Sequence, residues 1–141
     1  MVEEAFAVAV SSIVTTVIII LGVIFIVPLQ PILENAIYHG IEPKEEGGEI
    51  EISIDRNGDA LEICVIDTGV GIEEEKCRDI NSDLKNNENK VLRSIGLKNV
   101  NDRIKLMYGD DYGISVESIY GKYTEVLITM PFIAKEGDEI D

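Results

Sequence analysis

Three short segments follow one another along this chain in an order and spacing that suit nucleotide binding. They are Leu29–Gly40 (LQPILENAIYHG), Asp67–Gly71 (DTGVG) and Ser94–Val100 (SIGLKNV). An asparagine amide oxygen is a hard ligand for a magnesium ion that carries phosphate oxygens, and a carboxylate accepts a hydrogen bond from an amino group. The N–H groups at a helix start bind anions. Together these chemistries indicate a pocket for a nucleotide.

The first segment has the apolar spacing of a helix that ends at Gly40. Asn35 and His39 lie four residues apart, so both should project from one neighbouring face. Asn35 is then a metal-ligand candidate, and the imidazole of His39 can donate to a phosphate. The alternative is an ordinary helix with a polar outer stripe. The apolar residues expected to pack inward are Ile32, Leu33, Ala36 and Ile37.

The second segment closes a predicted hairpin, in which Asn57-Gly58 supplies the turn. Asp67 falls at a strand end, where its carboxylate can accept from an exocyclic amino group. Gly69 and Gly71 let the backbone approach a flat ring, and the combination favours adenine over guanine. The alternative is a tight turn without a ligand. The alternating apolar residues of the two strands are Ile50, Ile52, Ile54, Leu61, Ile63 and Val65.

The third segment begins a helix at Gly96, and its dipole and free N–H groups would attract phosphates. Lys98 adds a positive charge near this helix start. The polar stretch 81–90 (NSDLKNNENK) shows little periodicity and is either a lid over the triphosphate or a solvated loop. The apolar positions of the helix are Leu97, Val100, Ile104 and Met107.

In these motifs the chain resembles the GHKL ATP-binding domains shared by sensor histidine kinases, gyrase-type topoisomerases, Hsp90 and MutL. The LytS/YesM-like group of bacterial sensor histidine kinases is the closest match, over about Leu29–Phe132. The resemblance implies ATP and Mg2+ as cofactors, with Asn35 on the metal and Asp67 and Thr124 beside adenine. The catalytic candidates are Glu34, Asn35 and His39. The cofactor-binding candidates are Asn35, His39, Asp67, Gly69, Gly71, Ile72, Gly96, Leu97, Lys98 and Thr124.

Some positions depart from the family pattern. Members often carry a glycine at the position of Ser94, a basic residue at that of Tyr38 and a glycine at that of Tyr123, and Ser94 and Tyr123 are expected to narrow the site or alter lid motion. In the hydrolysing branch a glutamate lies one turn before the asparagine, where it can act as general base on water. Here that position is Pro31, and Glu34 points elsewhere. ATP is therefore expected to be held for transfer to a histidine, with little hydrolysis.

The only histidine of the chain, His39, belongs to the nucleotide helix. The resemblance therefore implies a catalytic domain that phosphorylates a histidine-containing dimerisation domain outside this sequence and reaches a response regulator indirectly. A homodimer remains open. Two other functions are retained: an anti-sigma-type serine kinase, whose N box reads differently, and a non-catalytic interaction domain of the same fold. The net charge of -15 disfavours binding to nucleic acid.

The chain divides into an apolar segment (1–27), a catalytic domain (28–133) and an acidic tail (134–141). Residues 5–27 carry no charge and are long enough for a membrane helix, but their Val, Ile and Thr content also fits a core strand or a dimer-forming segment. The domain should accordingly lie on the cytoplasmic face of the membrane, or in the cytoplasm if the segment belongs to the fold. Cys64 and Cys77 are expected to be free thiols.

The predicted architecture is a two-layer α/β sandwich with a mixed, mostly antiparallel sheet. The helix of the first segment and a helix over 97–107 should cover one face of the sheet. Hydrophobic alternation places Val126, Ile128 and Met130 inward. The expected strands are 49–54, 60–67, 114–118 and 124–131.

Overall fold

The computed structural model describes residues 1–86 and 95–132, without the side chains of 3–7 and 18–28. The chain forms two compact units, Met1–Gln30 and Pro31–Asp141, which are described separately. The acidic tail and Ser94 lie outside the described residues.

The apolar N-terminal segment is helical, because it lies within helix α1 (Val2–Glu34). The alternative of a core strand is therefore wrong. Hydroxyl residues fit this helix because Thr15 and Thr16 donate to the carbonyls of Ser11 and Ser12, both at 2.8 Å. Among the residues whose side chains the structure describes, which excludes 3–7 and 18–28, no helix is both long enough and apolar enough to cross a membrane.

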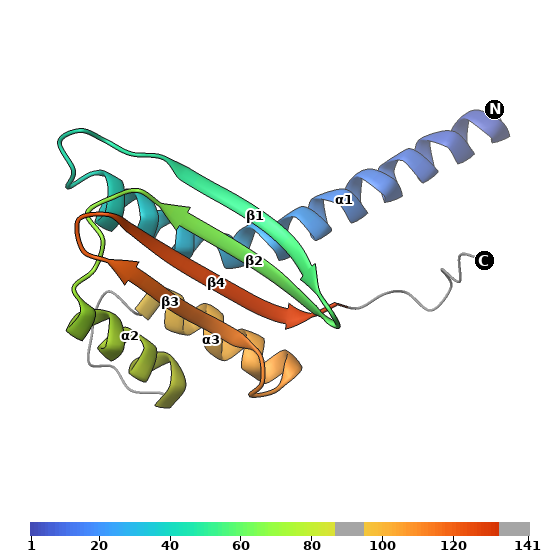
Figure 1. The fold of residues 1–141 in the computed structure, drawn as a ribbon. Helices are drawn as coiled ribbons and strands as arrows, with labels where there is room; N and C mark the ends of the chain where they lie inside the picture. The colour runs from blue at the N-terminus through green and yellow to red at the C-terminus, as the bar shows by residue number, and fades with distance from the viewer. Residues whose placement is uncertain (87–94, 133–141) are drawn as a thin grey trace. The chain divides into compact units, whose positions relative to one another are not determined.

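The second unit is built on a four-stranded sheet (Figure 1). Its strands are β1 (Ile50–Asn57), β2 (Ala60–Asp67), β3 (Gly113–Ile119) and β4 (Tyr123–Pro131). Their order is β1-β2-β4-β3, and every pairing is antiparallel. The predicted α/β fold and all four predicted strands are confirmed. The β1–β2 turn falls on Gly58, whose φ of +61° suits a tight hairpin.

The two faces of the sheet differ in composition, as the hydrophobic alternation predicted. Helices lie on one face, which is behind the sheet in Figure 1. The other face is open and carries the acidic side chains Glu51, Glu62, Glu117 and Glu125. The buried residues on the helix-covered face are Ile63, Val65, Asp67, Ile114, Val116, Thr124, Val126 and Ile128. Met130 has the same inward register but is only half-buried.

The first functional segment continues α1 as a π-helical stretch, η1 (Asn35–Ile41). Its wider turn is visible in the bond from the Glu42 amide to the Ile37 carbonyl, five residues earlier, at 2.9 Å. As a result Ile32, Ala36 and Gly40 are buried at a spacing of four. Ile37, expected to pack inward, is 46% exposed. That prediction was wrong because it assumed the narrower turn of an α-helix.

Two further helices complete the layer beside the sheet. Helix α2 (Glu74–Asn86) was not predicted, and it takes up residues 81–86 of the stretch expected to be a lid or loop. Its inner face is formed by Cys77, Ile80 and Leu84, a spacing that does signal a helix. Residues 87–90 lie outside the described residues.

Helix α3 (Ile95–Tyr108) confirms the predicted helix. It buries Leu97, Val100 and Ile104, but Met107 is 62% exposed. Asn101, a residue without a sequence role, is fully buried instead. The predicted inner face is therefore confirmed at three of its four positions, and Asn101 adds a buried amide to it.

Candidate functional site

A small cavity lies between η1, α3 and the helix-covered face of the sheet. Its volume is about 10 Å³, roughly the space of one water molecule. It brings together five of the sequence-predicted site residues, which come from four different elements and from the loop that follows β2. They are Asn35, Asp67, Ile72, Leu97 and Thr124. An adenine ring is larger than this cavity.

The polar wall of the cavity is formed by the end of β2 and the adjacent start of β4. Asp67 and Thr124 are directly paired across these strands, and each is 3% exposed. The Gly69 amide donates to Asp67 Oδ1 at 3.0 Å. This bond holds one carboxylate oxygen against the loop that follows β2, residues 68–73, which is called the glycine loop below.

The end of η1 rests directly on this aspartate. A Cβ added to Gly40 would overlap Asp67 Oδ1, and the Val70 amide donates to the Gly40 carbonyl at 2.9 Å. Gly40 was interpreted from sequence only as a helix stop. The structure shows that it is also the contact that allows η1 to approach Asp67.

The glycine loop is held from its other side by the β3–β4 turn. Gly71 has a φ of +70°, and a Cβ there would overlap the carbonyl of Ile119. The Gly121 amide donates to the Val70 carbonyl at 2.6 Å, and the Ile72 amide donates to Ser118 Oγ at 2.8 Å. Sequence reasoning missed Ser118, since one serine in an alternating strand carries no distinctive signal.

Asn35 lines the cavity next to the start of α3. Its Nδ2 donates to the Pro31 carbonyl at 2.8 Å, which leaves Oδ1 as the acceptor of the amide. A Cβ added to Gly96 would lie 3.2 Å from Pro31 Cβ and 3.9 Å from Asn35 Nδ2. The helix start that was expected to bind phosphate thus lies beside the expected metal ligand.

Six predicted site residues are not part of the cavity lining: the glycines Gly69, Gly71 and Gly96 described above, and Glu34, His39 and Lys98. Lys98 is paired with Asp102 on the next turn of α3, with 3.0 Å between Nζ and Oδ2. His39 and Glu34 are exposed on the helix that carries Asn35. Asn35 therefore lines this cavity and His39 does not.

Tyr123 does not narrow the cavity as expected. It precedes Thr124 in β4 and pairs with Ile119, so its side chain belongs to the opposite, open face of the sheet. It is not among the residues that line the cavity.

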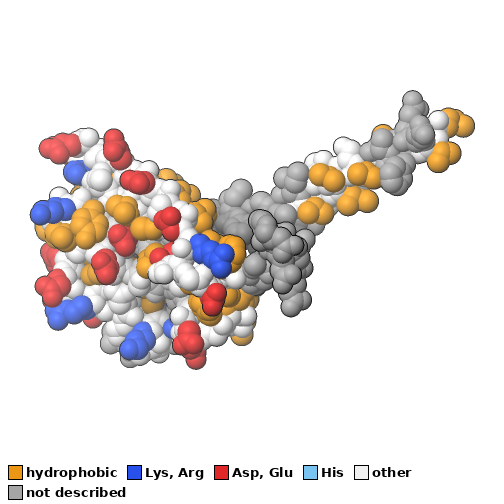
Figure 2. Space-filling view, turned by 45° about the vertical axis from the view of Figure 1, so that its right-hand side comes forward, with side chains coloured by type: hydrophobic (Ala, Val, Ile, Leu, Met, Phe, Trp, Pro, Cys, Tyr) orange, Lys and Arg blue, Asp and Glu red, His pale blue; other side chains and the backbone are white. Residues whose placement is uncertain are grey.

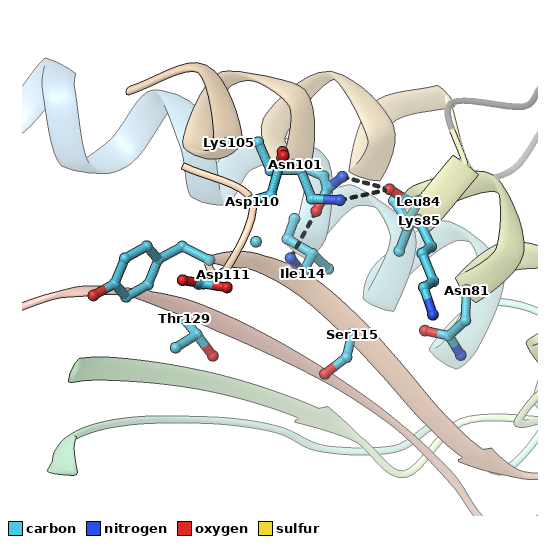
Figure 3. Close-up of a pocket in the computed structure, with 12 residues that line it drawn as sticks. Asn81, Leu84, Lys85, Asn101, Lys105, Asp110, Asp111, Ile114, Ser115 and Thr129 are labelled. Carbon is cyan, nitrogen blue, oxygen red and sulfur yellow. Dashed lines mark hydrogen bonds between the residues drawn. The ribbon is translucent and has the colours of Figure 1, made fainter. Parts of the chain in front are cut away.

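A larger depression of about 350 Å³ lies between α2, α3 and the start of β3 (Figure 3). Asn101 is central to it, because its Nδ2 donates to the Leu84 carbonyl and its Oδ1 accepts from the Ile114 amide, both at 2.8 Å. Lys105 also donates to the Leu84 carbonyl, at 3.3 Å. This depression contains none of the predicted site residues.

The open face of the sheet is electrostatically negative. Acidic side chains are spread over the surface seen in Figure 2, and those of β1, β2 and β4 surround Cys64. Burial raises the pKa of the Cys64 thiol, and the carboxylates of Glu125, Glu51, Asp55 and Glu62 raise it further. Burial and Glu117 likewise raise the pKa of Cys77. Both thiols are free, as predicted.

Comparison with known proteins agrees with this geometry. The family model for histidine kinase-, DNA gyrase B-, and HSP90-like ATPases matches residues 26–134. The chain is 39% identical over 83 residues to the sensor histidine kinase YpdA of Escherichia coli, covering 58% of this chain and 14% of that protein. It is 34% identical over 103 residues to the sensor histidine kinase YesM of Bacillus subtilis, covering 73% and 16%. The chain therefore spans a small part of these relatives.

Solved structures show the same fold. The histidine kinase domain of the blue-light activated kinase EL346 from Erythrobacter litoralis superposes with a TM-score of 0.52 at 22% identity, over 74% of this chain and 42% of that one. The catalytic domain of the histidine kinase ThkA gives a TM-score of 0.50 at 20% identity, over 74% and 66%. The chain belongs to the family of histidine kinase-, DNA gyrase B- and HSP90-like ATPases.

Proposed function

We propose that this domain binds Mg-ATP and presents the γ-phosphate to a histidine outside this sequence. The observation that carries the proposal is the meeting of Asn35, Asp67 and Thr124 in one cavity beside the start of α3. A carboxylate and a hydroxyl at the inner end suit the amino edge of adenine. A helix start and an amide at the other end suit phosphates and their metal.

The residues present fit a magnesium ion that is held largely by the nucleotide. No cluster of three or more His, Cys, Asp or Glu side chains suitable for a metal occurs in the described part of the chain. Asn35 has its Oδ1 left to accept or ligate once Nδ2 bonds Pro31. Mg2+ commonly keeps waters and substrate phosphates as most of its ligands, so one amide oxygen is sufficient.

The titration that tests the proposal compares wild type with Asp67→Asn. Asparagine keeps an oxygen for the Gly69 amide but adds two N–H donors toward the amino edge of adenine. Calorimetric titration of ATP with Mg2+ should show binding to wild type and a loss of about tenfold or more in the variant, which corresponds to about 1.4 kcal/mol. Asp59→Asn, an exposed carboxylate in the β1–β2 turn, is the matched control.

The titration and a labelling experiment together separate the retained alternatives. Absence of ATP binding to folded wild type would favour a non-catalytic interaction domain. If ATP binds, incubation with labelled ATP and a histidine-containing dimerisation domain should give an acid-labile phosphohistidine. Acid-stable label on serine would support a serine kinase instead, although the relatives named above are sensor histidine kinases. Use of ATP would place the domain on the cytoplasmic side, with a response regulator downstream.

A further inference from the structure

Ser118 lies at the centre of a hydrogen-bond network behind the cavity. Its Oγ is 2.6 Å from the Tyr123 carbonyl oxygen, 2.8 Å from the Ile72 amide and 3.0 Å from Thr124 Oγ1. Ser118 and Thr124 are also direct partners across β3 and β4. One hydroxyl therefore contacts the glycine loop, the β4 backbone and a residue of the cavity wall.

The direction of each of these bonds follows from the number of available protons. A serine hydroxyl has one donor and two acceptor positions. A carbonyl can only accept, so the Ser118 proton goes to Tyr123. The Ile72 N–H can only donate, so it occupies one Ser118 lone pair. The second lone pair remains for Thr124, and Thr124 must therefore donate its proton to Ser118.

This direction decides what Thr124 offers to a ligand. With its proton committed to Ser118, Thr124 Oγ1 has only acceptor positions left for the cavity that it lines. Its cross-strand partner Asp67 also acts as an acceptor, toward the Gly69 amide. A ligand group placed between them is bound when it donates and repelled when it accepts, because a buried acceptor without a donor costs about 1–3 kcal/mol.

We propose that Ser118 is a positioning residue that fixes the Thr124 hydroxyl as an acceptor and thereby selects a purine bearing a 6-amino group over one bearing a 6-carbonyl. The inference rests on the proposed function, since it concerns the base-reading end of the same nucleotide site. Ser118 does not line the cavity itself. It acts through its hydrogen bond with Thr124 and through the hydrogen bond that it accepts from the Ile72 amide.

The test is the ratio of ATP affinity to inosine triphosphate affinity, measured by calorimetry with Mg2+. Wild type should prefer ATP by tenfold or more. In Ser118→Ala the Thr124 hydroxyl is released and can turn to donate to a 6-carbonyl, so the ratio should fall at least fivefold. Ser118→Thr keeps the hydroxyl and should restore the ratio. Ser115→Ala, at an exposed position of the same strand, should leave it unchanged.

The outcomes distinguish the inference from the proposed function. A purely structural role of Ser118 would lower both affinities together and keep the ratio, which would overturn the inference while leaving the ATP site intact. Equal wild-type affinity for the two nucleotides would also overturn it. Binding of neither nucleotide to wild type would remove the proposed function and the inference together.

Discussion

Gly40 and Asp67 are in direct contact, such that no side chain at position 40 fits beside the Asp67 carboxylate. Gly40 belongs to η1 and Asp67 is the last residue of β2, so that β1 and the rest of β2 lie between them in the sequence. The contact sets how closely the helix that carries Asn35 approaches the strand end that carries Asp67. The two ends of the proposed nucleotide site are therefore linked through a glycine.

Gly40→Ala tests this contact, because two effects on stability have opposite signs. Alanine is favoured over glycine within a helix by about 1 kcal/mol, whereas overpacking costs about 1–3 kcal/mol. Overlap with Asp67 should dominate and lower the free energy of unfolding, measured in urea. Tyr38→Ala, an exposed position of η1, should change it little. A stabilised Gly40→Ala protein would contradict the contact.

Asn101→Ala should destabilise the domain strongly. It leaves the Leu84 carbonyl and the Ile114 amide without their asparagine partner, although Lys105 still contacts the carbonyl. Each buried group left unsatisfied costs about 1–3 kcal/mol. Urea unfolding should show this loss, whereas Asn99→Ala, exposed on the same helix, should stay near wild type. Equal stability of the two variants would show that Asn101 does not connect α2 and β3.

Asp102→Asn should strengthen the binding of ATP but not of adenosine. The change removes the charge that pairs with Lys98, which leaves the ammonium available to phosphates near the α3 start. An increase of a few fold in ATP affinity is expected, with a stability change within about 1 kcal/mol. Lys98→Met should weaken ATP alone. If both variants bind ATP as wild type does, Lys98 has no part in phosphate binding.

Alkylation of Cys64 should require a higher pH than alkylation of an ordinary cysteine. Its pKa is raised by burial and then by Glu125 and other carboxylates, and only the thiolate reacts. The rate of modification, followed by peptide mass spectrometry, should therefore rise at a higher pH than the rate for an ordinary cysteine. Glu125→Gln removes one negative charge and should shift the profile to lower pH. Glu75→Gln, at an exposed position of α2, should leave the profile unchanged.

Much of the fold was predictable from local pattern. Alternating apolar residues set the four strands and their inward faces, because the side-chain period of a strand is two. Asn57-Gly58 marked the first hairpin. The order of the three motifs and their resemblance to GHKL domains predicted that Asn35, Asp67 and Leu97 share one site, and all three line the same cavity.

The predictions that failed depended on helix geometry and tertiary contact. Ile37 turned outward because η1 is a π-helix, and Met107 is exposed in the last turn of α3. Helix α2 was not predicted, and its residues 81–86 were interpreted as part of a lid or loop because that stretch is polar, although three apolar positions form the inner face of the helix.

The sequence by itself determined the sheet, the motif order and the residue types of the site, because these follow from periodicity and side-chain chemistry. Only the tertiary structure decided which groups share a proton or exclude a side chain. The contact of Gly40 with Asp67 joins elements that are far apart in sequence, and the bond from Thr124 to Ser118 crosses between two neighbouring strands of one hairpin. Such contacts depend on distances of a few tenths of an ångström, to which the sequence pattern is insensitive.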